Sequence, residues 1–209
     1  MENTPKIKTE SNAYVFIDAS NVWSAVKSVK KFIDYRKLKK YFKDSFGVNE
    51  VSIFYYDAFP KEGTRGYDTS LKHGFYTQLK KGFGFTVRKK ELKRISTVNK
   101  SGKEIIKEKG NMDVEIVIDA VENIDKYDVA FLFSGDADFL ALVNYLKRHG
   151  KKVYIFSTAG NISNELKTGG DGYFDLKDID YIWSKDLDYR KDKTTLNKES
   201  GSRMDDPNS

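Results

Sequence analysis

Short apolar runs alternate along the chain with segments whose apolar residues recur at helical spacing. Continuous apolar runs predict strands at residues 14–17, 51–56, 129–133 and 153–156. Helical spacing predicts helices over residues 34–46, 68–81, 111–124, 139–148 and, more briefly, 161–167. Residues 173–183 complete the pattern. This alternation predicts an α/β fold of three layers, with helices on both sides of a mainly parallel central sheet.

A basic segment interrupts this regular order. A strand over residues 83–92, continuing to about Val98, is followed by the turn residues 99–102 and a second run at 104–107, which predicts a β-hairpin insertion. Its basic residues are Arg88, Lys89, Lys90, Lys93, Arg94, Lys100, Lys103 and Lys107. They fit a solvated strand surface. They also fit a positive track for a nucleic-acid backbone, with Phe83 and Phe85 available to stack on bases.

The two ends of the chain differ in composition from its centre. Residues 1–12 are polar and are expected to form a flexible arm. Residues 184–209 are almost entirely charged or polar, so they cannot bury enough apolar area to offset the entropy of ordering, and a disordered tail is expected. A single domain over residues 13–183 is therefore predicted, which suits a chain of 209 residues.

Composition excludes several classes of site. The chain has no cysteine and only two histidines, which excludes disulfide frameworks, thiolate zinc sites and histidine-rich metal sites. A bound metal would have to be a hard cation held by oxygen. No apolar run approaches the ~20 residues of a membrane helix, so a cytoplasmic protein without membrane contact is expected. The net charge of +6 is too moderate to decide a partner.

Aspartates follow three of the predicted strands. Asp18 and Asp57 each come directly after a strand, and Asp136 and Asp138 lie in the loop after another. The carboxyl ends of parallel strands meet at one edge of the sheet, where open α/β sheets bind ligands. Any single one of these aspartates could simply cap the following helix. Together they would repel one another, and a divalent cation would relieve that repulsion.

Three short motifs carry a family resemblance. The segments 16–21 (Phe-Ile-Asp-Ala-Ser-Asn), 109–113 (Lys-Gly-Asn-Met-Asp) and 133–139 (Phe-Ser-Gly-Asp-Ala-Asp-Phe) resemble, in order and spacing, the motifs of the NYN domain family. These are PIN-like nucleases that include LabA-like proteins. The chain departs from the usual pattern at Ala19, where many relatives have Gly, and in one extra residue between Lys109 and Asp113.

The resemblance implies a PIN-like fold and a set of site residues. Asp18, Asp113 and Asp136 would bind Mg²⁺ or Mn²⁺ and carry the catalysis, joined by Asp138 unless that residue only caps a helix. The expected substrate contacts are Asn21, Ser134, Lys109, Arg88, Lys89 and Lys90, although a capping amide remains open for Asn21. Asp119, about 240° round its helix from Asp113, is expected to be structural. The same helix is amphipathic, with Val114, Val117, Ile118 and Val121 on or near one stripe.

The resemblance also implies a function. A metal-dependent ribonuclease that hydrolyses RNA phosphodiesters as an endonuclease is expected, with RNA as partner and a homodimer left open. The alternative is a non-catalytic regulatory module that binds RNA or protein on a PIN-like fold. A third reading is a phosphatase or nucleotidase that uses the same metal site on a small substrate.

Overall fold

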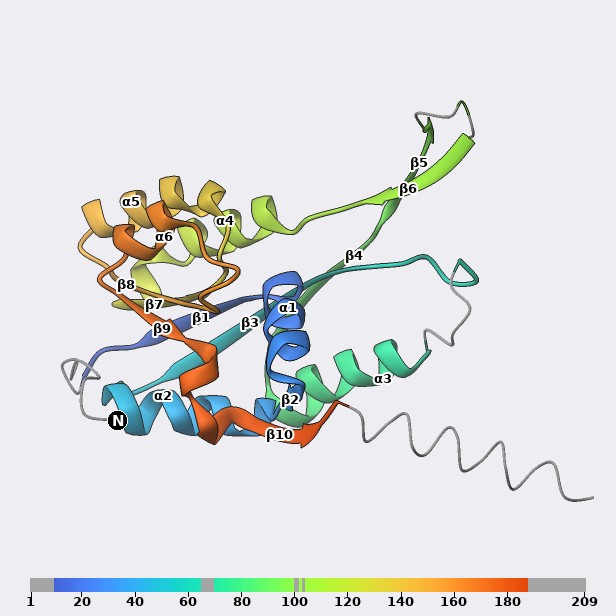
Figure 1. The fold of residues 1–209 in the computed structure, drawn as a ribbon. Coiled ribbons are helices and arrows are strands. Elements are labelled where there is room, and N and C mark those ends of the chain that lie inside the picture. Colours follow the sequence, from blue (N-terminus) through green and yellow to red (C-terminus); the bar gives the residue numbers. More distant parts are fainter. Residues whose placement is uncertain (1–9, 65–69, 100–101, 103, 188–209) are drawn as a thin grey trace, which may run out of the picture.

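A six-stranded sheet forms the centre of the computed structural model, which describes residues 10–64, 70–99, 102 and 104–187 (Figure 1). Its strands run in the order β4-β3-β1-β7-β8-β9, and every neighbouring pair is parallel. The bounds are β1 Ala13–Asp18, β3 Val51–Phe59, β4 Thr86–Glu91, β7 Val129–Phe133, β8 Lys152–Ser157 and β9 Gly172–Asp175. The mainly parallel sheet predicted from the apolar runs is confirmed.

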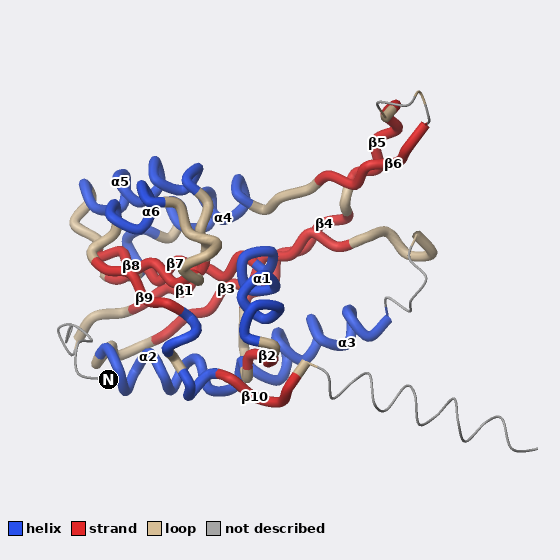
Figure 2. The backbone as a smooth tube through the Cα atoms, viewed as in Figure 1, coloured by secondary structure: helices blue, strands red, loops and turns tan. Residues whose placement is uncertain are grey.

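Helices cover both faces of this sheet, as the three-layer prediction requires (Figures 1 and 2). They are α1 Ala19–Val29, α2 Leu38–Phe46, α3 Ser70–Thr77, α4 Asp113–Glu122, α5 Leu140–Arg148 and α6 Asn164–Gly169. Side chains alternate across each strand. Val15 and Ile17 of β1 therefore pack with α1 and α2, whereas Phe16 packs in a second cluster with α4, α5 and α6. Aromatic rings fill much of the first cluster, for example Phe42 stacked on Phe131 at 4.3 Å between centroids.

Helix α1 was absent from the sequence prediction. It begins directly after β1 and buries Val22, Ala25 and Val26 against the sheet. These residues follow the i, i+3, i+4 spacing of a helix face, and Asp18 caps the helix by accepting a hydrogen bond from the backbone N–H of Ser20 at 2.9 Å. The helix could thus have been found from the same signals that revealed the others.

The predicted strand over residues 83–98 is in fact two strands that belong to different sheets. Residues 78–82 form a π-helical turn, β4 starts at Thr86 and joins the central sheet, and the chain leaves that sheet after Leu92. Strands β5 Lys93–Val98 and β6 Glu104–Lys109 then form an antiparallel pair that projects from the body, here called the arm (Figures 1 and 2). The predicted hairpin is confirmed, and Lys100 and Lys103 lie outside the described residues.

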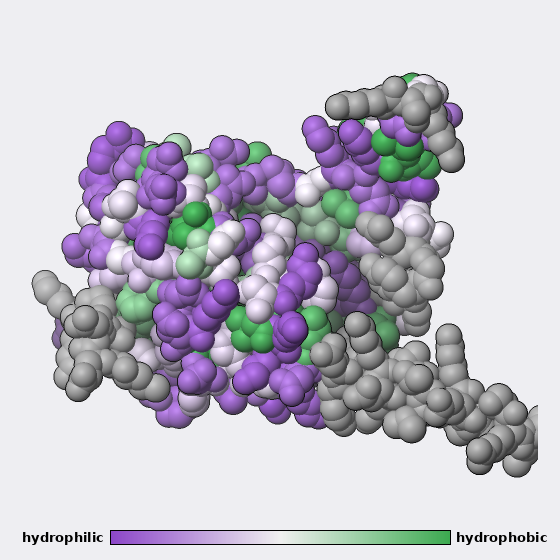
Figure 3. Space-filling view, in the orientation of Figure 1, coloured by the Kyte–Doolittle hydropathy of each residue, from purple (hydrophilic) through white to green (hydrophobic). Residues whose placement is uncertain are grey.

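The arm exposes apolar as well as basic side chains. Ile95, Val98 and Ile106 are all exposed, and green atoms mark an apolar patch on the projecting arm in the space-filling view (Figure 3). A two-stranded hairpin is marginally stable alone in water, and here it is continuous with β4 on one side and leads into α4 on the other.

Of the four residues in the apolar stripe predicted on α4, only Val121 packs against the core. Val114, Val117 and Ile118 are exposed, while Ile116 and Ala120 are fully buried. The physical reason is a buried polar anchor: Asp119 on the inner face accepts hydrogen bonds from Tyr56 and Arg88, so this face turns inward despite its charge. A pattern of apolar residues alone could not reveal that contact.

The described chain continues past the expected end of the domain. Strand β10 Trp183–Asp186 pairs with β2 Lys31–Ile33 in a small antiparallel sheet, and the N–H of Leu187 donates to Lys30 O. The flexible segment expected over residues 1–12 is described only from residue 10, and there Ser11 and Asn12 are hydrogen-bonded to Asn49 and Asp128. Of the tail expected over residues 184–209, residues from 188 onward lie outside the described residues. Within the described ranges, no helix combines the length and apolar character that a membrane crossing requires.

Candidate metal centre

The carboxyl ends of β1 and β7 are neighbours in the sheet. Ile17 pairs with Phe133, so Asp18 and the loop of residues 134–136 leave the sheet side by side. From β1 the chain continues to β3 and β4 on one side, and only later forms β7, β8 and β9 on the other. The strand order therefore reverses at this point, which is where open α/β sheets bind ligands.

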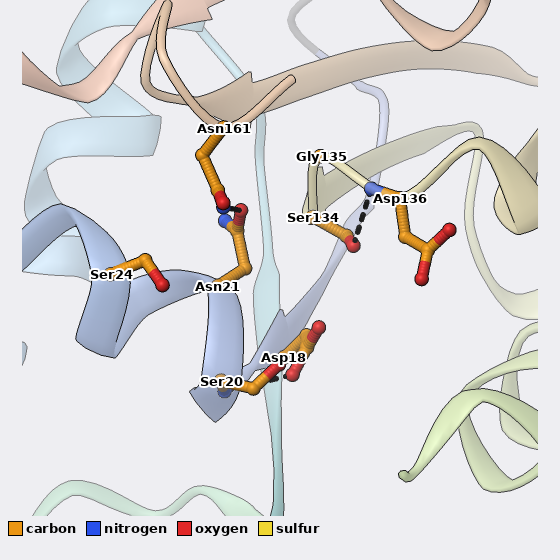
Figure 4. Close-up of a pocket in the computed structure, with 8 residues that line it drawn as sticks. All are labelled: Asp18, Ser20, Asn21, Ser24, Ser134, Gly135, Asp136 and Asn161. Atoms are coloured by element: carbon orange, nitrogen blue, oxygen red, sulfur yellow. Dashed lines mark hydrogen bonds between the residues drawn. The ribbon is translucent and has the colours of Figure 1, made fainter. Parts of the chain in front are cut away.

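Asp18 and Asp136 each begin a helical segment. Asp18 caps α1, and Asp136 Oδ1 accepts from the N–H of Asp138 at 3.0 Å to cap the 3₁₀ turn Ala137–Phe139. The cap considered for Asp138 is therefore provided by Asp136, and the Asp138 side chain is left exposed. In Figure 4 the carboxylates of Asp18 and Asp136 point to the same side of the site.

Three of the four predicted metal ligands come together. Asp113, the first residue of α4, offers a carboxylate oxygen that lies with oxygens of Asp136 and Asp138 within 4.8 Å of one another. Oxygens that share one Mg²⁺ at about 2.1 Å can be at most about 4.2 Å apart, so small side-chain rotations suffice to place all three on one ion. Asp18 is not a member of this triplet.

Asp18 nevertheless belongs to the same electrostatic unit. Burial raises the pKa of the Asp18 carboxyl above its ordinary value, and the charge of Asp136 raises it further. Burial also raises the pKa of Asp113, followed by the charges of Asp18, Asp136 and Asp138, while Lys90 opposes the rise. Crowded carboxylates of this kind favour a bound cation.

A pocket of about 350 Å³ opens beside Asp18 and Asp136 (Figure 4). Its lining is polar and consists of Asp18, Ser20, Asn21, Ser24, Ser134, Gly135, Asp136 and Asn161. A water molecule takes about 30 Å³ in the liquid, so the volume admits a phosphate group together with several waters.

The amide of Asn21 is occupied inside the protein. It is buried, and its Oδ1 accepts from Ser157 Oγ at 2.9 Å and from Asn161 Nδ2 at 2.6 Å. It is thus not the cap of α1, which is Asp18, and the contacts shown tie α1 to the end of β8. Ser134 Oγ accepts from the N–H of Asp136 at 3.3 Å and so helps to orient that residue.

Gly135 fixes the loop that carries Asp136. A Cβ at this position would lie 1.9 Å from the backbone oxygen of Asn161, and the Gly135 carbonyl accepts from the N–H of Ser163 at 2.9 Å. Only glycine permits this close approach. Asn161 was absent from the predicted site because it lies in the chain outside the three motifs, and its role depends on a contact that spacing does not reveal.

The three bases of β4 are engaged by the protein itself. Arg88 forms a bidentate pair with Asp119, through Nε at 3.0 Å and a terminal nitrogen at 2.9 Å. Lys90 binds Glu115 of α4 at 2.7 Å. Lys89 points to the opposite face, as strand alternation requires, and lies 3.2 Å from His73 Nδ1. Asp119 is structural, as expected.

The remaining candidates are Lys109, Asp57 and the two phenylalanines Phe83 and Phe85. Lys109 is exposed at the base of the arm, opposite Lys93. Asp57 is buried and receives the Tyr76 hydroxyl at 2.8 Å. Phe85 is buried in the core and Phe83 packs against it, so the suggestion that these two rings stack on bases is wrong for Phe85 and unsupported for Phe83.

Comparisons with known proteins identify the family and the fold of the chain. The model of the NYN domain family matches residues 12–177. The chain is 31% identical over 169 residues to the low amplitude and bright protein LabA of Synechococcus elongatus, covering 81% of this chain and 86% of LabA. A crystal structure of a Vibrio parahaemolyticus protein of unknown function, VPA0982, superposes with a TM-score of 0.61 at 23% identity, over 86% of this chain and 99% of that one.

The family match over residues 12–177 includes the six strands of the central sheet, helices α1 to α6 and all four aspartates of the centre. The chain belongs to the NYN domain family. The structural match to VPA0982 supports the fold alone, and the PIN-like α/β architecture implied by the sequence motifs is confirmed.

Proposed function

We propose that this protein is a divalent-metal-dependent ribonuclease that hydrolyses RNA phosphodiester bonds as an endonuclease. The observation that supports it most is the triplet Asp113, Asp136 and Asp138 within 4.8 Å, with Asp18 beside it at the point where strand order reverses. The choice of RNA rests on membership of the NYN domain family.

The donor set suits Mg²⁺ or Mn²⁺, because every candidate ligand is a carboxylate oxygen. When bound, such an ion polarises a phosphate and lowers the pKa of water. Asp113, Asp136 and Asp138 would hold it. The Ser20 and Ser24 side chains line the adjoining pocket and can bind phosphate or ribose oxygens. Asn21 and Ser134 are assigned positioning roles through the contacts described above. Lys90 is the cationic side chain whose charge lowers the pKa of Asp113.

Cleavage of a labelled single-stranded RNA in Mg²⁺ or Mn²⁺ tests the proposal. Asp136→Asn should lower the rate about 100-fold or more, because a metal ligand contributes several kcal/mol to transition-state stabilisation. The matched control is Asp125→Asn, an exposed aspartate beyond the end of α4, which should cleave like the wild type. Equal cleavage by wild type and Asp136→Asn would point to a contaminating nuclease and reject the proposal.

Thermal unfolding with Mn²⁺ separates metal binding from catalysis. A ligand at 100 times its Kd stabilises the folded state by about 2.7 kcal/mol, so Mn²⁺ should raise the Tm of the wild type and not that of Asp136→Asn. RNA that binds and stays intact for hours with metal present would instead favour the regulatory module. Inhibition of RNA cleavage by mononucleotides, which are themselves dephosphorylated, would favour the phosphatase.

A further inference from the structure

The helix that begins at the candidate centre also carries an exposed tryptophan. Asp18 caps α1, and Ser20, Asn21 and Ser24 of this helix line the pocket. Trp23 lies between them in the sequence and is 50% exposed, whereas Trp183, the second tryptophan of the chain, is 6% exposed. Large aromatic side chains usually bury most of their area, so this exposure calls for a functional explanation.

Helix geometry makes Trp23 a neighbour of Ser20, which lines the pocket, although Trp23 is not itself a lining residue. Residues three apart on a helix are neighbours on its surface, so Trp23 adjoins Ser20. A helical side chain also leans toward the helix N-terminus and covers the turn that precedes its own Cα. These directions turn the indole toward the first turn of α1, where Ser20 donates its backbone N–H to Asp18.

The rest of the exposed face of α1 is polar or basic. Ser20, Trp23 and Lys27 follow one another along it at spacings of three and four residues, and all three are exposed. The opposite face is buried in the core. An aromatic ring flanked by a hydroxyl and a cation matches the base, ribose and phosphate of one nucleotide.

Other aromatic side chains do not compete for this role. Among the described residues, the exposed aromatic side chains are Trp23 and Tyr181. Tyr181 belongs to a 3₁₀ turn packed on α2, with Lys37 Nζ at 5.4 Å from its ring centroid. It therefore serves as an exposed aromatic control on a different element of the fold.

We propose that Trp23 is a stacking platform for an unpaired RNA base adjacent to the phosphate that reaches the carboxylates, an assignment that rests on the proposed function. A base in a duplex is already stacked and paired, so the platform selects single strands. Base–aromatic stacking is tolerant of sequence because every base has a π face. Trp23 thus determines the strandedness of the substrate and not its sequence.

Tryptophan fluorescence reads this contact without cleavage. A ten-nucleotide oligouridylate is titrated into the wild type without metal and into Asp136→Asn with Mg²⁺. We expect quenching to come from the exposed Trp23, because Trp183 is buried and its indole N–H donates to Leu176 O.

Fluorescence anisotropy of labelled RNA measures the affinity. Trp23→Ala in the Asp136→Asn background should bind RNA about 5- to 100-fold more weakly. Trp23→Phe should recover part of the loss, and Tyr181→Ala should bind normally.

The outcomes separate the platform from the nuclease. Cleavage by wild type, with unchanged RNA affinity in Trp23→Ala and no quenching, would overturn the platform and leave the nuclease standing. Trp23-dependent quenching and affinity without cleavage in either metal would keep the platform and reject the nuclease. Equal quenching by a duplex of the same length would overturn the selection of unpaired bases. Absence of both binding and cleavage would overturn both assignments.

Discussion

Two sets of aspartates lie around this fold, and they differ in what faces them. Asp57 and Asp119 are buried and neutralised: Asp57 meets Lys72 at 3.0 Å and the Tyr76 hydroxyl, and Asp119 meets Arg88 and the Tyr56 hydroxyl. The set of Asp18, Asp113, Asp136 and Asp138 faces mainly other carboxylates, and burial and mutual repulsion raise the pKa of its members Asp18 and Asp113. The first set is paired within the fold, whereas the charges of the second set would be balanced by a bound cation.

The largest expected difference between the sets is in activity. Asp113→Asn should lower RNA cleavage about 100-fold or more, because it removes a metal ligand, without lowering the metal-free Tm. Asp119→Asn should have the opposite profile, since it weakens the pair with Arg88 and leaves the acid centre intact. Cleavage assays and thermal unfolding of both variants make the comparison. A folded but inactive Asp119→Asn protein together with an active Asp113→Asn protein would contradict the division of the aspartates into a structural set and a catalytic set.

A smaller effect should distinguish Arg88 from its neighbour Lys89. Arg88→Ala leaves the buried Asp119 carboxylate with the Tyr56 hydroxyl as partner, and loss of a partner to a buried charged group costs about 1–3 kcal/mol. Lys89→Ala, on the opposite face of β4, should change the free energy of unfolding by less than about 1 kcal/mol. Urea denaturation measures both. A stable Arg88→Ala protein with a raised KM for RNA would instead return Arg88 to the substrate contacts first predicted.

The smallest effect is a dependence of stability on pH in metal-free buffer. The folded-state pKa of Asp113 is raised, so the folded protein binds more protons than the unfolded chain, and this stabilising term is lost as pH rises above the ordinary value near 4. Asp113→Asn cannot titrate. The Tm of the variant minus that of the wild type should therefore grow between pH 4 and pH 7 in EDTA. A difference that stays constant or shrinks would contradict the assigned repulsion.

Local patterns were enough to predict the central strands and the edge at which the acids gather. Apolar runs identify β1, β3, β7 and β8 because buried parallel strands need them on both faces. The Ser-Gly-Asp-Ala-Asp segment was enough to predict that Asp136 and Asp138 lie close together, because one short loop holds both.

Long-range contacts limited the rest of the prediction. The ion pair of Arg88 with Asp119 joins β4 to α4. It holds Asp119 on the inner face of that helix, where apolar residues were expected. It also engages one of the basic side chains expected to bind phosphate. Asn161 enters the pocket through its contact with Asn21, 140 residues away. Neither contact leaves a periodic signal in the sequence, because each depends on where separate elements meet.

The capping bonds of Asp18 and Asp136 have a consequence for how mutational scans of this family should be designed. In each carboxylate one oxygen, Oδ1, receives a backbone N–H. Alanine at either position deletes that acceptor along with the charge, so a helix cap and a negative charge of the candidate metal centre are lost together. Asparagine keeps an oxygen in place and removes only the charge. The ratio of the activities of the alanine and asparagine variants at one position therefore measures how much of the loss in the alanine variant comes from the missing helix cap, and how much from the missing charge.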